Sequence, residues 1–357
     1  MNFRSFLCAA ALLFAPLCGA SLWEASAADK GPLAEAAPAA GEGAKKAPPR
    51  AVAPFDARQA RAHQEAWAKA LGLAVESTNS VGAKMVLIPA GEFLMGSTDD
   101  QKEAALKIAE STKAKEEAIE RRVEAELPQH RVVITKPFLL GRTEVTVGQF
   151  RKFVEASKYV TEAEQYGFGD AGGTMLTDKV DAEDKGKMWQ TPGYEASDDM
   201  PVSELSWNDA TAYCRWLSKQ ENVVYRLPTE AEWAFACRAG TTTLYFFGDD
   251  PAEFGKYGTF DENSGGQARP VGQRLPNAFG LCGMHGNVQE WCSDYYGEAW
   301  YAQSPVENPS GPEKSRYRVV RGGAWNFPVT YCRSATRTYF APSHRYANLG
   351  FRLVREL

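Results

Sequence analysis

The stretch from Gly240 to Leu357 is the part of the sequence that most constrains the fold. Glycine, proline, asparagine, aspartate and aromatic residues dominate it, and only short alternating runs such as Arg318 to Arg321 predict strands. Long helices and wide regular sheets are not expected from such a composition. We therefore predict a loop-rich domain in which tryptophan side chains supply much of the core.

Helix starts are the local signals that can be placed with most certainty. In three segments a serine or threonine is followed three positions later by a residue with a polar side chain. The hydroxyl residue can cap the start of a helix, and the later side chain can bond back to its backbone N–H. The pairs are Thr146 with Gln149, Ser206 with Asp209, and Thr229 with Glu232. Each pair predicts a helix that begins one residue after the cap.

The N-terminus has the features of a secretory signal peptide over residues 1–27. Arg4 precedes an apolar run that ends at Leu17, and Ala25-Ser26-Ala27 fits a cleavage site of small residues. We therefore expect an exported chain, periplasmic or extracellular. No later stretch reaches 18 uninterrupted apolar residues, so no transmembrane anchor is expected in the mature protein.

The rest of the chain divides into four parts. Residues 28–55 are rich in Ala, Gly and Pro and predict a disordered linker. An N-terminal helix is expected within 56–77, because Ala60 and Trp67 share a face and Gly72 can cap its end. The main domain is expected over 84–357. A charged insert at about 99–126 predicts one protruding surface helix, with a partner-binding arm as the alternative.

Several function classes are excluded or disfavoured by what the sequence lacks. The net charge of -5 offers no basic surface for phosphates, so nucleic acid is not an expected partner. There is no GxSxG, Walker, HExxH or CxxC motif. A GxGxxG match at 167–172 is neither preceded by a predicted strand nor followed by a helix, so it does not predict a nucleotide site. The four histidines are too dispersed to suggest a zinc or iron triad.

Seven ordered segments resemble one known family, the formylglycine-generating, sulfatase-modifying-factor enzymes. They are MVLIPAGEFLMGS from Met85, EVTVGQF from Glu144, PVSELSWNDATAYC from Pro201, RLPTEAEW from Arg226, GNVQEW from Gly286, RGGAW from Arg321 and NLGFR from Asn348. The resemblance covers about Lys84 to Leu357. It implies an α+β fold of the C-type-lectin-like kind with little regular secondary structure. In the family's enzymes, copper and oxygen convert a sulfatase cysteine to formylglycine.

The resemblance breaks at the residues that carry this chemistry. The active enzymes place two cysteines shortly after the Gly-Gly of the RGG motif, because two thiolates can hold Cu(I). Counted from Gly323, the first position is Phe327 here, and Cys332 is the only cysteine near the second. The serine after Gly-Gly is Ala324, and the tryptophan of the GNxWEW motif is Gln289. A copper site is therefore not expected, and Cys332 is the sole candidate catalytic residue.

The cysteine count allows both disulfides and a free thiol. Seven cysteines are present, and five remain once Cys8 and Cys18 leave with the signal peptide. In an oxidising compartment an odd number suggests up to two disulfides and one free thiol. The family register places Cys332 near a structural cysteine, which implies a disulfide with Cys237. A free, reactive Cys332 is the alternative.

The resemblance also implies calcium sites. Glu290 matches the family's carboxylate ligand, and Gly286 and Val288 match its carbonyl donors, while Gly283 stands where an Asn or Asp is expected. A second, weaker match falls on Asn263. The alternative for Glu290 is a carboxylate that only accepts hydrogen bonds within its loop. Calcium is thus a possible cofactor with one ligand missing.

Two function classes remain, and they differ in whether Cys332 is reactive. The favoured hypothesis is a non-catalytic relative that binds a peptide, protein or glycan or serves in assembly. The alternative is an oxidase, either a formylglycine-forming enzyme or another periplasmic oxidase of the same fold. Six tryptophans could form a carbohydrate platform, but packing in the core and at its rim is the favoured role. They are Trp207, Trp216, Trp233, Trp291, Trp300 and Trp325.

Overall fold

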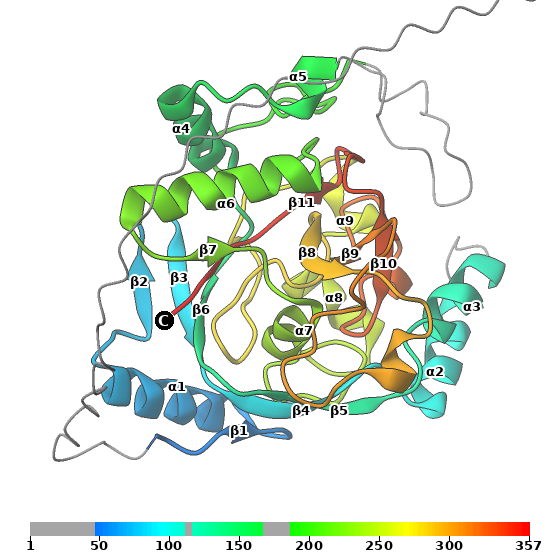
Figure 1. The fold of residues 1–357 in the computed structure, drawn as a ribbon. Coiled ribbons are helices and arrows are strands. Elements are labelled where there is room, and N and C mark those ends of the chain that lie inside the picture. The colour runs from blue at the N-terminus through cyan, green and yellow to red at the C-terminus, as the bar shows by residue number, and fades with distance from the viewer. Residues whose placement is uncertain (1–46, 111–115, 167–185) are drawn as a thin grey trace, which may run out of the picture. The chain divides into compact units, whose positions relative to one another are not determined.

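A computed structural model describes residues 47–110, 116–166 and 186–357 (Figure 1). One compact unit runs from Lys45 to Leu357. The predicted signal peptide, most of the predicted linker and the GxGxxG match at 167–172 lie outside the described residues. No helix among the described segments is long and apolar enough to cross a membrane.

The strands form three small sheets (Figure 1). The first has the order β1-β4-β5, the second β2-β3-β6-β12-β7 and the third β10-β9-β8-β11. The strands are β1 (Ala51–Val52), β2 (Glu76–Thr78), β3 (Lys84–Ile88), β4 (Gly91–Met95), β5 (His130–Ile134), β6 (Phe138–Gly141), β7 (Tyr225–Arg226), β8 (Gln289–Tyr295), β9 (Arg318–Arg321), β10 (Arg337–Phe340), β11 (Leu349–Gly350) and β12 (Val354–Arg355). The second sheet is antiparallel throughout, whereas β1 pairs parallel with β4 and β11 parallel with β8.

Most helices are short and are joined by long loops. They are α1 (Ala57–Leu71), α2 (Asp99–Glu110), α3 (Glu116–Glu124), α4 (Val147–Ser157), α5 (Glu162–Tyr166), α6 (Trp207–Glu221), α7 (Glu230–Arg238), α8 (Phe254–Tyr257) and α9 (Asp261–Ser264), with the 3-10 turns η2 (Pro251–Glu253), η3 (Trp300–Gln303) and η4 (Val329–Tyr331). The predicted mixture of short helices and strands is confirmed.

The three predicted N-terminal caps are confirmed. Thr146, Ser206 and Thr229 each accept a hydrogen bond from the backbone N–H three residues later, and the side chain at that position returns a bond to the cap. Each pair therefore satisfies two backbone donors that a helix start otherwise leaves free. This local chemistry explains why α4, α6 and α7 begin where the sequence indicated.

The N-terminal region is folded further toward the N-terminus than expected. Within the predicted segment 56–77, the helix α1 ends at Leu71, where Gly72 caps it as predicted with a left-handed φ of 68°. Residues 76–78 form β2 instead. Ala51 of the predicted linker lies in β1 and is fully buried. The folded unit thus includes residues that the sequence analysis placed in the linker.

The charged insert is not one protruding helix, and that prediction was wrong. It forms two helices, α2 and α3, whose apolar stripes are each thin but together bury Ala105, Ala109, Ile119 and Val123. Tyr331 of η4 packs against the same cluster. Pairing the two stripes buries apolar surface that a single exposed helix would leave in water.

Two large apolar clusters form the core. One lies between the first sheet and α7, and the other lies between the second sheet, α4 and α6. The predicted role of the tryptophans is confirmed, since Trp233 and Trp291 are fully buried and the other four that the sequence singled out are half-buried. None of these six indoles lies open on the surface as a platform.

Candidate functional site

The turn that follows β9 builds the part of the molecule where the family's chemistry is expected. Gly322 and Gly323 have φ values of 100° and 76°, a region that favours glycine. A Cβ on Gly323 would lie 2.4 Å from the Sγ of Cys332. Because Gly323 has no side chain, the segment after η4 can pack Cys332 directly against this turn.

Cys332 is fully enclosed. None of its surface is exposed, and its Sγ lies 4.0 Å from the carbonyl oxygen of Ala324 and 3.8 Å from that of Pro328. Burial raises the pKa of the Cys332 thiol to about 12. Since the thiolate is the nucleophile and the metal ligand, this cysteine is in an unreactive state.

Phe327 occupies the position of the missing cysteine and fills it with apolar volume. Its ring lies 5.6 Å from the ring of Tyr331 and packs against the cluster that contains Cys332. The guanidinium of Arg122, from α3, lies 4.2 Å from the Tyr331 ring centre and 5.5 Å from that of Phe327. The insert therefore covers the segment that carries Phe327 and Cys332.

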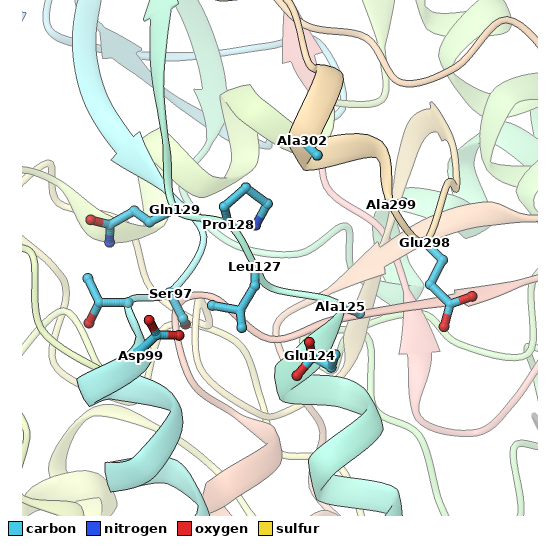
Figure 2. Close-up of a pocket in the computed structure, with 11 residues that line it drawn as sticks. Ser97, Asp99, Glu124, Ala125, Leu127, Pro128, Gln129, Glu298, Ala299 and Ala302 are labelled. Atoms are coloured by element: carbon cyan, nitrogen blue, oxygen red, sulfur yellow. The ribbon is translucent and has the colours of Figure 1, made fainter.

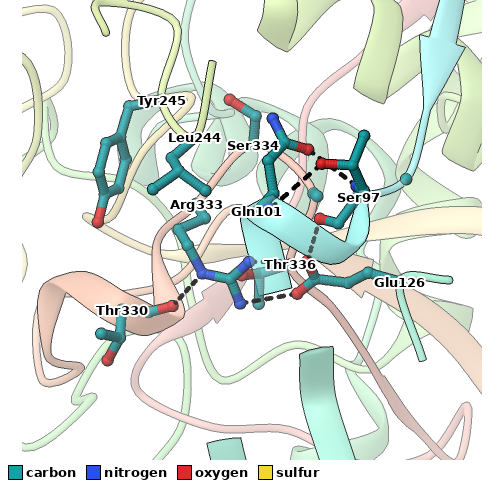
Figure 3. A network of polar contacts seen from close by, with 12 residues as sticks. Ser97, Gln101, Glu126, Leu244, Tyr245, Thr330, Arg333, Ser334 and Thr336 are labelled. Carbon is teal, nitrogen blue, oxygen red and sulfur yellow. Dashed lines mark hydrogen bonds and ion pairs between the residues drawn. The ribbon is translucent and has the colours of Figure 1, made fainter. Parts of the chain in front are cut away.

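A buried ion pair fixes the insert to this segment (Figure 3). Arg333 donates to both carboxylate oxygens of Glu126, at 2.7 and 2.8 Å, and to the carbonyl oxygen of Thr330. Ser97 donates to the same carboxylate at 2.7 Å. Both ends of the insert are thus tied to the residue that follows Cys332, and side chains of Glu126 and Arg333 are essentially unexposed.

The other two substituted positions are also buried. Ala324 is fully enclosed, and Gln289 lies in β8, where its backbone N–H donates to the carbonyl oxygen of Asn348. Trp325 turns the other way, and its indole N–H donates to the carbonyl oxygen of Ala347 at 3.3 Å. Neither substituted side chain supplies a charged or nucleophilic group.

The expected disulfide is not formed in this structure. Cys237, in α7, and Cys332 are both free, as are the other three cysteines of the described segments. The Sγ of Cys237 lies 3.9 Å from the carbonyl oxygen of Met284, and burial raises its pKa to about 12. Cys237 is therefore a buried thiol that packs as a small apolar group.

All five thiols are expected to resist alkylation in the folded protein, because each of them is buried. Iodoacetamide at pH 8 should label none of them within minutes, and should label all five after unfolding in guanidinium without any reductant. Peptide mapping by mass spectrometry gives the readout. Rapid labelling of native Cys332 would show a reactive thiol, and labelling that requires a reductant would restore the disulfide hypothesis.

The loop predicted to bind calcium is held together by an arginine. Both oxygens of Glu290 accept hydrogen bonds from Arg352, at 2.5 and 2.6 Å, and one of them also accepts from the indole of Trp233 at 2.7 Å. Calcium needs six to eight oxygen ligands. Because the guanidinium already neutralises Glu290, this donor set does not fit a calcium ion as it stands.

Of the remaining predicted ligands, the side chain of Asn263 is engaged, whereas Gly286 and Val288 would offer backbone carbonyl oxygens. Asn263 accepts from the N–H of Phe260 and donates to the carbonyl oxygen of Gly258, so it serves its own turn. Gly286 donates to Gly322, and a Cβ there would lie 2.0 Å from the carbonyl oxygen of Thr259. Val288 is buried in a small apolar cluster. Gly286 and Val288 precede β8 and Glu290 lies within it, and calcium titration tests whether this segment binds the ion.

Glu144 is a polar residue of this region that sequence reasoning missed. It is buried, and both of its carboxylate oxygens lie 2.5 Å from where a Cβ on Gly283 would stand. Asn287 donates to one oxygen at 2.9 Å, and the other has no hydrogen-bond partner among the residues that the structure describes. Burial, with the charge of Glu290 nearby, raises the pKa of Glu144 to about 7. No sequence signal indicated that Glu144 would fill the space beside Gly283.

Comparison with known proteins agrees with this architecture. The model of the sulfatase-modifying factor enzyme 1-like domain matches residues 72–357. The chain is 34% identical over 307 residues to the formylglycine-generating enzyme of Streptomyces coelicolor, covering 76% of this chain and 88% of that protein. Against the formylglycine-generating enzyme of Mus musculus the identity is 33% over 309 residues, covering 76% of this chain and 75% of that one.

Solved structures give the same result. PvdO from Pseudomonas aeruginosa is similar with a TM-score of 0.64 and 30% identity, over 79% of this chain and 98% of that chain. Treponema denticola variable protein 1 is similar with a TM-score of 0.56 at 23% identity, over 80% of this chain and 100% of that chain, and it bears on the fold alone. The predicted α+β fold is confirmed.

Proposed function

Given that the chain belongs to the sulfatase-modifying factor enzyme 1-like family, we propose that it is an exported member that does not oxidise sulfatase cysteines and acts instead as a binding or assembly module. Its ligand is a peptide, a protein or a glycan. Export is tested by the N-terminus of the chain recovered from the periplasm or the medium, which we expect at residue 28.

One observation carries the proposal. The position of the first family cysteine is Phe327, and the remaining cysteine, Cys332, is enclosed beneath it with a raised thiol pKa. Cu(I) chemistry of this kind needs two accessible thiolates. Here one thiol is absent, and the other lies in a buried cluster against which Ala104 and Ile108 of the insert pack.

The surrounding residues support the same conclusion. Buried polar interactions keep the fold rigid next to the altered site, as the pairs Glu126–Arg333 and Glu290–Arg352 illustrate. The scaffold beside the altered site is therefore intact, as a binding role requires.

The deciding experiment is a direct assay for the aldehyde. The purified mature chain is incubated with Cu(I), oxygen and a peptide of the form Cys-x-Pro-x-Arg, and mass spectrometry follows conversion of the cysteine. We expect no formylglycine above the level of a Cys332→Ser variant, while the Streptomyces coelicolor enzyme serves as the positive control. Turnover that disappears in the Cys332→Ser variant would establish the oxidase instead.

A further inference from the structure

An open groove lies beside the insert (Figure 2). Its volume is about 730 Å³, and it lies between the start of α2, the end of α3 with residues 125–129, and the segment 298–302. Its apolar lining comes from Ala125, Leu127, Pro128, Ala299 and Ala302. This volume lies within the range that binds a small molecule or a short stretch of extended peptide.

Three exposed carboxylates line this groove, and none of the described residues that line it is basic. Asp99 begins α2, Glu124 ends α3, and Glu298 lies across from them (Figure 2). Lys102, outside the lining, forms an ion pair with Glu124 and offsets part of the charge. The balance remains negative, which attracts a cationic ligand and repels an anionic one.

The start of α2 does not reverse this preference. Helix starts attract anions through free backbone N–H groups. Here the side chain of Thr98 accepts from the backbone N–H of Gln101 at 3.2 Å, and the side-chain oxygen of Gln101 accepts from the backbone N–H of Thr98. With the cap satisfied and Asp99 beside it, this helix end adds little attraction for an anion.

Buried arginines hold the walls of the groove in place. Arg337 donates to the carbonyl oxygens of Ala125 and Gly297, at 3.3 and 3.2 Å, and so joins the two facing walls. Arg333 and Ser97 both bind Glu126, which fixes the start of α2 to the end of α3 (Figure 3). A groove with fixed walls binds with less loss of conformational entropy than a flexible one.

From these features we propose that the groove binds an extended segment of a partner protein in which lysine or arginine side chains alternate with small apolar residues. The cationic side chains reach Asp99, Glu124 and Glu298, and the small residues lie on the apolar lining. This inference rests on the proposed binding function and names the chemistry of its partner.

Fluorescence anisotropy with a labelled Ala-Lys-Ala-Lys-Ala-Lys peptide in low-salt buffer tests the proposal on the full mature chain. The variant Asp99→Asn/Glu124→Gln/Glu298→Gln should bind about tenfold more weakly. The binding free energies of three exposed ion pairs of ordinary strength add up to that change in affinity. The variant Glu103→Gln/Glu110→Gln/Glu120→Gln is the matched control, since it makes the same change in charge at exposed positions of the insert outside the groove. It should bind within about twofold of the wild type.

Four results would overturn the proposal: no measurable binding of the lysine peptide, equal loss in both variants, equal binding of an Ala-Glu peptide of the same length, or self-association that the groove variant abolishes. The last would assign the groove to a second copy of the chain. Formylglycine formation would contradict the proposed function without changing any of these readings, so the two failures are distinguishable.

Discussion

Replacing Arg352 by methionine is expected to lower the free energy of unfolding by about 3–5 kcal/mol at pH 7. The change leaves Glu290 fully buried with only the indole of Trp233 as a donor, and it removes the cation that faces Glu144. Arg352 also donates to the carbonyl oxygens of Gly141 and Cys282, at 3.0 and 3.1 Å, and these acceptors would be left unsatisfied. Urea unfolding followed by tryptophan fluorescence measures the effect.

The double variant Arg352→Met/Glu290→Met separates the buried charge from lost packing. It should recover most of the stability, because replacing a whole buried ion pair by apolar side chains is often close to neutral. Calcium should not raise the unfolding midpoint of the wild type, since Arg352 already occupies both Glu290 oxygens. An Arg352→Met variant as stable as the wild type, or a wild type stabilised by calcium, would show that Arg352 does not take the place of a calcium ion at Glu290.

The parts of the fold that the sequence predicts are those that local chemistry determines. The cap at Thr229 needs only Glu232, three residues away, and the end of α1 needs only a glycine that tolerates positive φ. The resemblance to a family supplied the topology, which no local pattern contains. β3 and β4, adjacent in sequence, belong to different sheets, and periodicity alone cannot show this.

The candidate site was predictable in composition but not in contacts. The sequence alone shows that Phe327, Ala324 and Gln289 replace the family's residues. The pairing of Arg352 with Glu290, the approach of Glu144 to Gly283 and the contact of Arg122 with Tyr331 each join residues more than 60 positions apart. Such contacts depend on the tertiary structure. The insert shows the same limit. Each of its two helices has only a thin apolar stripe, and the sequence does not show that the two stripes pack against each other.

The second large effect is expected at Glu126, whose carboxylate balances the charge of the buried Arg333 guanidinium. Glu126→Gln leaves the buried guanidinium of Arg333 without an anion and weakens the bond from Ser97. The cost should be about 3–5 kcal/mol. Because Glu126 joins the insert to the segment after Cys332, we expect this cost to appear first as local opening of α2 and α3 rather than as unfolding of the whole chain.

Glu124→Gln is the matched control for this prediction, since it makes the same chemical change two residues earlier at a side chain that is 65% exposed. Its effect should stay below about 1 kcal/mol, as for other surface ion pairs. Hydrogen exchange should show loss of protection over 99–126 in Glu126→Gln only, and iodoacetamide should then label Cys332 in the otherwise folded protein. If both variants protect Cys332 equally, the insert does not close this site, and the turn at Gly323 and the apolar cluster around Cys332 enclose it.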